Sequence, residues 1–183
     1  NGDPINQITG SNNNYNSNIC TSPGYVEHFN VIYYNGYAID DTRNVCPAGW
    51  SVPTILDYEI ILNLFNETTP SNNNSGTVYG KEWDNSGKAL KSLSPSPNGG
   101  DFWSNNNLLN NDNSHLSFLK HYEAYCTNSS FSQSHGDPSY WSSTDSPWNS
   151  PTKWVIRLTD GSDLVRIFDL GFGNTSTTRC VKD

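Results

Sequence analysis

Side chains that carry oxygen ligands are concentrated between residues 98 and 151 of this 183-residue chain. The carboxylates of Asp101, Asp112, Asp137 and Asp145 stand in this stretch among many asparagines. Calcium binds six to eight such oxygens, commonly on irregular backbone. We therefore expect Ca²⁺ as a cofactor, with these four aspartates as candidate ligands. The alternative is that they form solvated turns, because Asp and Asn side chains bond to their own backbone in loops.

Aromatic side chains stand in or beside the same polar stretch, at Trp103, Tyr140 and Trp148. Rings flanked by Asn, Ser and Asp can stack on a sugar or clamp a peptide. With nearby polar side chains they give a candidate ligand-binding set of Trp103, Asn105, Asn107, His115, Tyr140 and Trp148. In contrast, Trp50 and Trp141 lie in the CPAGWSVPT and YWSST segments, and we predict that both are core residues.

The chain carries no sequence motif that indicates catalysis. Its four histidines lack metal-binding spacing, and there is no nucleophile elbow, phosphate-binding loop or dinucleotide fingerprint. Asp40 and Asp41 are adjacent carboxylates, but we expect them to be exposed turn residues with nothing to perturb them. The prediction is that the protein is not an enzyme.

Four cysteines, at positions 20, 46, 126 and 180, show no Cys-x-x-Cys spacing. This favours two disulfides in an oxidising compartment over a zinc site, and the spacing alone leaves three connectivities open. The net charge of −8 and the scattered Lys and Arg residues argue against nucleic acid and anionic membranes as partners. No apolar run approaches the ~20 residues that span a bilayer, so membrane insertion is not expected.

Composition indicates one domain with polar, aromatic-rich loops. There are 26 asparagines and 24 serines, and only 15% of residues are charged. Surfaces rich in Tyr, Ser, Gly and Asn are typical of recognition loops, although a secreted β-rich protein with polar loops has a similar composition. Residues 1–24 are predicted as a strap or linker, and residues 25–183 as the single domain.

Hydrophobic periodicity places one strong helix after a pair of early strands. Residues 25–39 are strand-like, and Asn35-Gly36 between aromatic runs predicts a hairpin turn. Thr54, with Asp57 three residues later, predicts the start of a helix. The apolar face of that helix comprises Ile55, Tyr58, Ile61, Leu62 and Phe65.

The second half of the chain is predicted to be mostly loop and then strands. A short helix is expected over residues 86–93, followed by loop over 94–151 with strands only at 116–119 and 140–144. Strands are expected at 154–158, 164–168 and 177–181, with a turn at Asp160-Gly161. Loops as long as 94–151 tend to be functional.

Four motifs occur in the order found in one known family: CPAGWSVPT (46–54), GKALKS (87–92), YWSST (140–144) and TRCVKD (178–183). Together they make residues 44–183 resemble the Fibrobacter succinogenes major paralogous domain. That family is similar to C-type lectin-like domains. The resemblance implies an α+β fold of two helices, small antiparallel sheets and a long loop region. It also implies a Cys46–Cys180 disulfide, which leaves Cys20 to pair with Cys126.

The resemblance further implies a secreted or cell-surface bacterial module, but it carries no activity. Residues 115–122 (HLSFLKHY) depart from the family pattern, and Cys20 and Cys126 are additional. The sugar-binding Glu-Pro-Asn, Gln-Pro-Asp and Trp-Asn-Asp motifs of lectin-like domains are also absent. The ligand class is therefore not implied.

The sequence is consistent with three functions. The first is an extracellular binding or adhesion module, part of a larger surface protein or assembly, that recognises a glycan or an extracellular protein or peptide through the long loop. The second is a structural subunit of a surface filament or stalk with no small ligand. The third is an enzyme of the formylglycine-generating type, which has a distantly related fold and needs a reactive cysteine pair.

Overall fold

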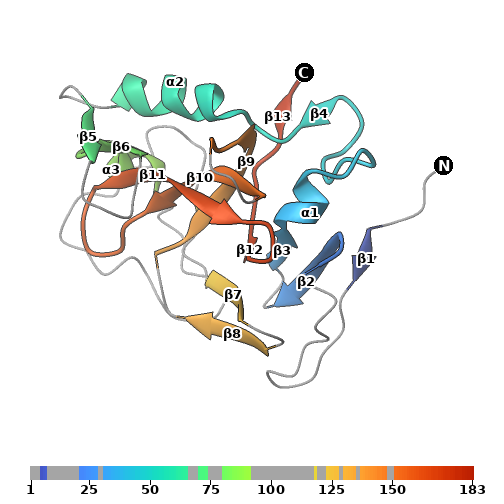
Figure 1. The fold of residues 1–183 in the computed structure, drawn as a ribbon. Helices are drawn as coiled ribbons and strands as arrows, with labels where there is room; N and C mark the ends of the chain where they lie inside the picture. Colours follow the sequence, from blue (N-terminus) through green and yellow to red (C-terminus); the bar gives the residue numbers. More distant parts are fainter. Residues whose placement is uncertain are drawn as a thin grey trace.

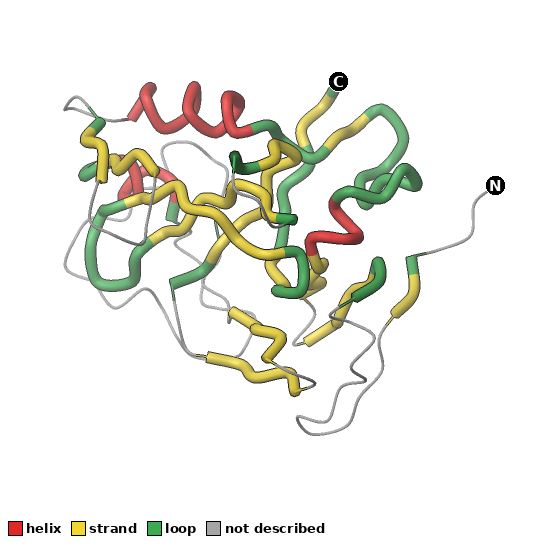
Figure 2. The backbone as a smooth tube through the Cα atoms, viewed as in Figure 1, coloured by secondary structure: helices red, strands yellow, loops and turns green. Residues whose placement is uncertain are grey.

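A computed structural model describes residues 5–7, 21–28, 31–65, 70–73, 80–91, 118, 123–127, 130–134, 137–147 and 151–183. Over these residues the protein has a mixed α+β fold of small sheets and short helices (Figures 1 and 2). The predicted α+β class with a few helices and small antiparallel sheets is confirmed.

The described strands form three sheets. The first contains, in order, β1 (Asn6–Gln7), β2 (Gly24–His28), β3 (Val31–Asn35), β12 (Thr175–Ser176), β7 (Glu123–Thr127) and β8 (Ser130–Ser134). The second contains β5 (Ser71–Asn73), β6 (Gly80–Trp83), β11 (Val165–Gly171), β10 (Thr152–Leu158) and β9 (Ser139–Asp145). The third pairs β13 (Val181–Lys182) with β4 (Trp50–Ser51). Named strands pair antiparallel, except β1 with β2.

In the described part of the chain, three helices accompany the sheets: α1 (Gly36–Ile39), α2 (Ile55–Phe65) and α3 (Ser86–Leu90). The capping prediction for α2 is confirmed. The Thr54 N–H donates to Oδ2 of Asp57 at 2.7 Å, and the Asp57 N–H donates to Oγ1 of Thr54 at 3.2 Å. This reciprocal pair satisfies backbone donors that the first turn of a helix otherwise leaves without partners.

The five-stranded sheet separates two apolar clusters because alternate residues of a strand point to opposite faces. On β10, Ile156 and Leu158 join a cluster with the inner face of α2, whereas Val155 joins a cluster beside α1 and the disulfide. The predicted apolar face of α2 packs on the first cluster, with Tyr58 and Leu62 fully buried. Figure 1 shows α2 lying along one side of this sheet.

The predicted hairpin turn at Asn35-Gly36 is wrong. Asn35 instead caps α1, its side chain accepting a hydrogen bond from the Ala38 N–H at 2.9 Å. Gly36 does not adopt positive φ. A Cβ there would lie 2.6 Å from Cα of Phe172, so the glycine permits a close backbone approach. Strands β2 and β3 instead pair with each other on either side of positions 29–30, from Tyr25 opposite Tyr34 to His28 opposite Val31.

The prediction of loop over residues 94–151 missed the β7–β8 hairpin. The strand expected at 140–144 is β9, which extends one residue further at each end. Of the strand expected at 116–119, the structure describes Phe118 alone, which forms an isolated β-bridge with Lys91. The helix predicted over 86–93 ends at Leu90. The strand expected at 177–181 is wrong, because the chain there forms β12 (Thr175–Ser176) and β13 (Val181–Lys182), with residues 178–180 outside any strand. The Asp160-Gly161 turn is present, with Gly161 at φ +80°.

The two motif tryptophans differ in burial. Trp141 is fully buried in the second cluster, as predicted, and its indole N–H donates to the carbonyl of Tyr34 at 2.7 Å. The prediction that Trp50 is a core residue is wrong, because its side chain is 41% exposed. Trp50 lies on the two-residue strand β4, which pairs only with β13 at the edge of the fold.

Asp40 and Asp41 both have ion-pair partners, so the expectation that they lack interacting neighbours is wrong. Asp40 pairs with Lys153 at 2.8 Å, and Asp41 accepts from Nε and Nη2 of Arg43 at 2.7 and 2.6 Å. The hydrogen bonds from the Arg43 side chain and backbone lower the pKa of Asp41 from 3.8 to about 2. This pair fixes the turn that leads from α1 toward Cys46.

The lowered pKa of Asp41 predicts a pH dependence of stability. The unfolded chain binds the proton first, so the contribution of Asp41 is present above pH ~4 and is lost as the pH falls toward 2. An exposed pair contributes about 1 kcal/mol or less. Thermal unfolding midpoints measured from pH 5 to 2 should therefore converge between wild type and Asp41→Asn as the pH falls. Arg43→Gln should behave in the same way, and a constant offset between wild type and Asp41→Asn would contradict this account.

Candidate functional site

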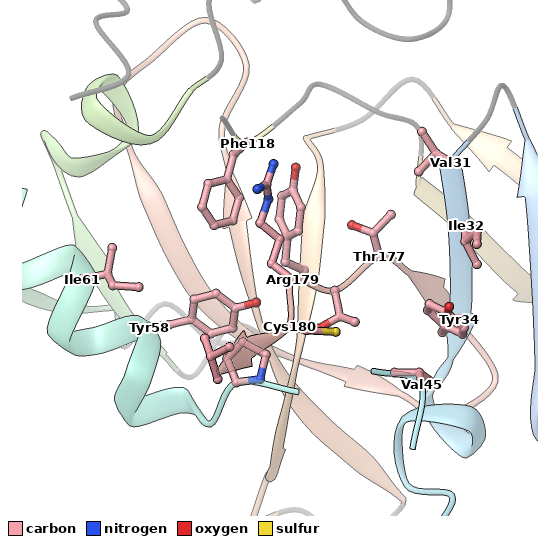
Figure 3. Close-up of a pocket in the computed structure, with 14 residues that line it drawn as sticks. Val31, Ile32, Tyr34, Val45, Tyr58, Ile61, Phe118, Thr177, Arg179 and Cys180 are labelled. Carbon is pink, nitrogen blue, oxygen red and sulfur yellow. The ribbon is translucent and has the colours of Figure 1, made fainter. Parts of the chain in front are cut away.

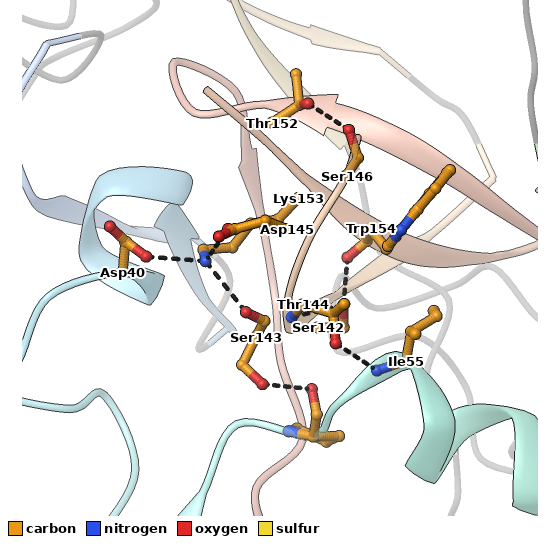
Figure 4. Close-up of polar contacts among 11 residues, drawn as sticks. Asp40, Ile55, Ser142, Ser143, Thr144, Asp145, Ser146, Thr152, Lys153 and Trp154 are labelled. Atoms are coloured by element: carbon orange, nitrogen blue, oxygen red, sulfur yellow. Dashed lines mark hydrogen bonds and ion pairs between the residues drawn. The ribbon is translucent and has the colours of Figure 1, made fainter. Parts of the chain in front are cut away.

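Three of the sequence motifs meet at β9. The Ser143 N–H donates to the carbonyl of Pro53 at 2.8 Å, and the Ile55 N–H at the start of α2 donates to Oγ1 of Thr144 at 3.0 Å (Figure 4). On β9 the Trp141 N–H donates to the carbonyl of Thr177 at 2.8 Å. These bonds hold the start of α2 and the C-terminal segment against the same strand.

Lys153 is a buried cation on β10 that joins α1 to β9. Its Nζ lies 2.6 Å from Oδ1 of Asp145 and 2.8 Å from Oδ1 of Asp40, and it donates to the carbonyl of Ser143 at 3.1 Å (Figure 4). It also lies 5.4 Å from the centre of the Phe172 ring. Two carboxylates and a carbonyl replace the water lost by this ammonium group, so its burial is compensated.

A Cys46–Cys180 disulfide links the segment before β4 to the segment before β13, with the Cα atoms 5.8 Å apart. The pairing implied by the family resemblance is confirmed. No cysteine side chain that the structure describes is a free thiol. A disulfide is consistent with an extracytoplasmic location.

Pro53, Thr177 and the disulfide residue Cys180 border a cleft of about 560 Å³, within the range of small-molecule and peptide sites (Figure 3). One wall comes from β3 and another from α2. Residues 177–181 line it together with Phe118 and with Tyr140 of β9. Its aliphatic lining residues are Val31, Ile32, Val45, Pro53, Ile61 and Val181. Ile32 is 41% exposed, so apolar surface continues out of the cleft.

Arg179 brings a positive charge to this apolar cleft. Its guanidinium carbon lies 5.1 Å from the centre of the Phe118 ring, within cation–π range, and Figure 3 shows the two side by side. Tyr58 lies nearby on α2, and its hydroxyl donates to the carbonyl of Trp141 at 3.2 Å. Arg179 therefore places a guanidinium group against an aromatic ring of the cleft.

Two tyrosines of the cleft, Tyr34 and Tyr58, have raised pKa values and are neutral at physiological pH. Burial raises the pKa of Tyr58 far above its usual range, and burial followed by the neighbouring Tyr25 raises that of Tyr34. No Asp or Glu is among the described lining residues. The charge of the described lining is therefore that of Arg179.

The structure places one of the predicted ligand-binding residues at the cleft. Tyr140 is buried and lines it, with its ring edge-on to Phe118 at 4.5 Å between centroids. The others lie outside the described residues: Trp103, Asn105, Asn107, His115 and Trp148. Cys20 also lies outside them, and only the backbone of Cys126 is described, so the Cys20–Cys126 pairing stays a prediction.

Two of the candidate calcium ligands are described, and both have protein partners. Asp137 accepts from the Asp160 N–H at 2.7 Å, and Asp145 binds Lys153. Among the described residues no group of three or more His, Cys, Asp and Glu side chains could hold a metal ion. Asp101 and Asp112 lie outside the described residues, so the calcium site stays a prediction.

Sequence reasoning did not single out Arg179 or the apolar wall on β3. Arg179 directly precedes Cys180. Because the disulfide holds this backbone against the core, the position of Arg179 in the sequence could have predicted that it lies near the core. Val31 and Ile32 have no such signal. The alternation of β3 predicts that one of these adjacent residues faces inward, but not what the inner face meets.

Comparisons with known proteins agree with the motifs. Searches of the curated proteins and of solved structures found no match to this chain. The sequence model of the Fibrobacter succinogenes major domain matches residues 1–182, which extends the likeness well beyond residues 44–183, where the motifs lie. The chain therefore belongs to the Fibrobacter succinogenes major domain family.

Proposed function

We propose that this protein is a non-catalytic binding or adhesion module at the bacterial cell surface or outside the cell, with a C-type lectin-like fold. Its ligand is a glycan or an extracellular protein or peptide. Three features support the fold: a main helix packed on a small antiparallel sheet, a long region between the first helices and the final strands, and a disulfide from the α2 region to the C-terminal segment. No helix among the described residues is long and apolar enough to cross a membrane.

The observation that carries this proposal is the cleft. Phe118 and Tyr140, two of its aromatic lining residues, belong to the 98–151 stretch in which the candidate ligand-binding residues cluster. Among the described lining residues, the cleft joins apolar surface to one guanidinium, an arrangement suited to recognition. Part of the remaining 98–151 stretch, with Trp103 and Trp148, would complete the ligand contacts.

A glycan and peptide array, probed with the whole chain in the presence and absence of a chelator, tests the proposal. Trp103→Ala and Trp148→Ala should each lower the affinity for array hits by tenfold or more, because buried aromatic anchors dominate binding free energy. Trp50→Ala is the matched control, since Trp50 is not among the described residues of the cleft. Full binding by both loop variants would overturn the loop assignment, and loss of binding on chelation would support Ca²⁺.

A filament or stalk subunit is the second candidate, favoured by the outer face of α2. Leu56, Ile60 and Leu64 lie four residues apart there and are 64%, 62% and 73% exposed. A helix that is apolar on both faces is usually buried, which makes contact with another subunit a reasonable expectation. Self-association in size-exclusion chromatography without any array hit would favour this candidate.

The enzyme alternative is the least supported. A formylglycine-generating type of chemistry needs a reactive cysteine pair, whereas Cys46 and Cys180 form a disulfide.

A further inference from the structure

We infer that the cleft binds an extended peptide that adds to β3 as a further strand. Its backbone pairs with the main chain of Ile32, and its alternate, apolar side chains point into the cleft. This inference rests on the proposed binding function and narrows its ligand from a glycan or a protein segment to an extended peptide. The pairing uses main-chain groups and requires no charge on the ligand.

Two hydrogen bonds define which edge of β3 the main chain of Ile32 faces. Alternate residues of a strand turn their N–H and C=O groups to opposite edges. The Gly36 N–H donates to the carbonyl of Phe172 at 2.9 Å, and the carbonyl of Tyr34 accepts from the indole N–H of Trp141 at 2.7 Å. Gly36 and Tyr34 therefore face away from β2. Ile32, two residues before Tyr34, turns its N–H and C=O to the same edge.

Strand β12 covers only part of that edge. It pairs with the last two residues of β3. From Thr177 the chain turns to β9, where the Trp141 N–H donates to the carbonyl of Thr177 at 2.8 Å. None of the described strands therefore lies opposite Ile32 on this edge. The cleft opens at this point, between β3 and residues 177–181 (Figure 3).

A peptide strand in the cleft would continue the pairing that β12 begins. Strand edges present main-chain donors and acceptors, and extended segments that add to them gain affinity from main-chain hydrogen bonds. Because β12 pairs antiparallel with β3, a peptide that continues it would also run antiparallel to β3. This continuity with an existing strand pair favours an extended peptide over other occupants.

The lining of the cleft favours apolar side chains on one face of the added strand. Alternate side chains of a strand share a face. Its apolar lining includes Val45, Ile61, Phe118 and Val181, and Ile32 is 41% exposed at the rim. Apolar side chains placed against these residues gain free energy by leaving water. A sugar would instead lose hydrogen bonds where its hydroxyls meet aliphatic side chains, which costs binding free energy.

The experiment measures binding of labelled, end-capped hexapeptides to the whole chain by fluorescence anisotropy. One peptide alternates valine with threonine, and its block isomer has three valines followed by three threonines. The alternating peptide should bind at least tenfold more tightly, because only alternation places every valine on one face. Two further forms are N-methylated at all valines or at all threonines, so each lacks the donors of one strand edge. At least one of them should bind tenfold or more weakly than the unmethylated peptide.

Protein variants test the edge of β3. Ile32→Pro removes the N–H that faces the cleft, and proline is tolerated where a strand N–H has no ladder partner. It should lower the affinity for the alternating peptide at least tenfold while the thermal midpoint stays near that of wild type. Ile32→Thr keeps the N–H and the β-branched shape, so its affinity should stay within about threefold of wild type. Val31→Pro removes an N–H on the β2 edge and should lower the midpoint, which checks the assigned direction.

Several outcomes would overturn the inference. Equal affinity of the alternating and block peptides would do so, as would full binding by both N-methylated forms, whether or not Ile32→Pro folds. Full binding by a folded Ile32→Pro would overturn the assignment to β3. Binding of array glycans without binding of the peptides would overturn the inference while the proposed binding function stands. Absence of both peptide and glycan binding would overturn both.

Discussion

Replacing both bridged cysteines, as Cys46→Ala with Cys180→Ala, should lower the free energy of unfolding by about 5 kcal/mol. The bridge closes a loop across a sequence separation of 134 residues, and removing it frees the unfolded chain to expand. For a domain of this size the loss corresponds to a decrease of about 10–20 °C in the unfolding midpoint. Calorimetry and urea titration of the oxidised proteins measure it.

The same titration tests the mechanism of that loss. If the bridge acts on the unfolded state, the variant should expose more surface on unfolding and show a steeper dependence on urea. The cleft residues near Cys180 should still bind ligand below the new midpoint. A loss under about 2 kcal/mol with an unchanged urea slope would contradict the chain-entropy explanation.

Trp141→Ala should be the most damaging single substitution in the core, lowering the free energy of unfolding by about 4 kcal/mol. The side chain is fully buried between Val155, Leu170 and the disulfide, so its removal leaves a cavity. It also leaves the carbonyl of Tyr34 without its indole donor, which adds a desolvation cost. Urea unfolding followed by circular dichroism measures the loss.

Two comparison variants separate the effect of burial from that of the lost hydrogen bond. Trp50→Ala changes the same residue type at a 41% exposed position and should lower the free energy of unfolding by about 1 kcal/mol or less. Trp141→Phe keeps much of the ring but loses the N–H, and its effect should fall between the two. Equal losses in Trp50→Ala and Trp141→Ala would show that burial does not determine these effects.

The sequence predicted those parts of the fold that depend on interactions between residues close together in the chain. The capping box of Thr54 and Asp57, the apolar face of α2 and the strands around Asp160-Gly161 depend on neighbours within a few residues. The Cys46–Cys180 pairing required the family resemblance, because four cysteines alone permit three connectivities.

Predictions failed where a distant contact decides the local structure. Asn35-Gly36 has the composition of a turn, yet the backbone of Phe172 approaches Gly36 and Asn35 caps a helix. Trp50 belongs to the CPAGWSVPT motif, but its strand pairs at the edge of the fold with residues near the C-terminus. Neither partner can be identified from the neighbouring residues.

The candidate site was predicted only in part for the same reason. The polar, aromatic stretch indicated a binding region and included Tyr140, which lines the cleft. Arg179 and Ile32 come from opposite ends of the chain, and only the packing of β3 beside the C-terminal segment brings them together. No spacing rule relates two positions so far apart.

The covalent link between Cys46 and Cys180 also determines how the protein would carry mechanical force. Tension applied to the chain on either side of the bridge passes from one cysteine to the other and bypasses residues 47–179. Tyr58, Phe118, Tyr140 and Arg179 belong to that unloaded loop, whereas Ile32 on β3 lies on the loaded side. Pulling would therefore act on one wall of the cleft while the opposite wall keeps its shape, so a ligand in the cleft would experience the load where β3 meets the C-terminal segment.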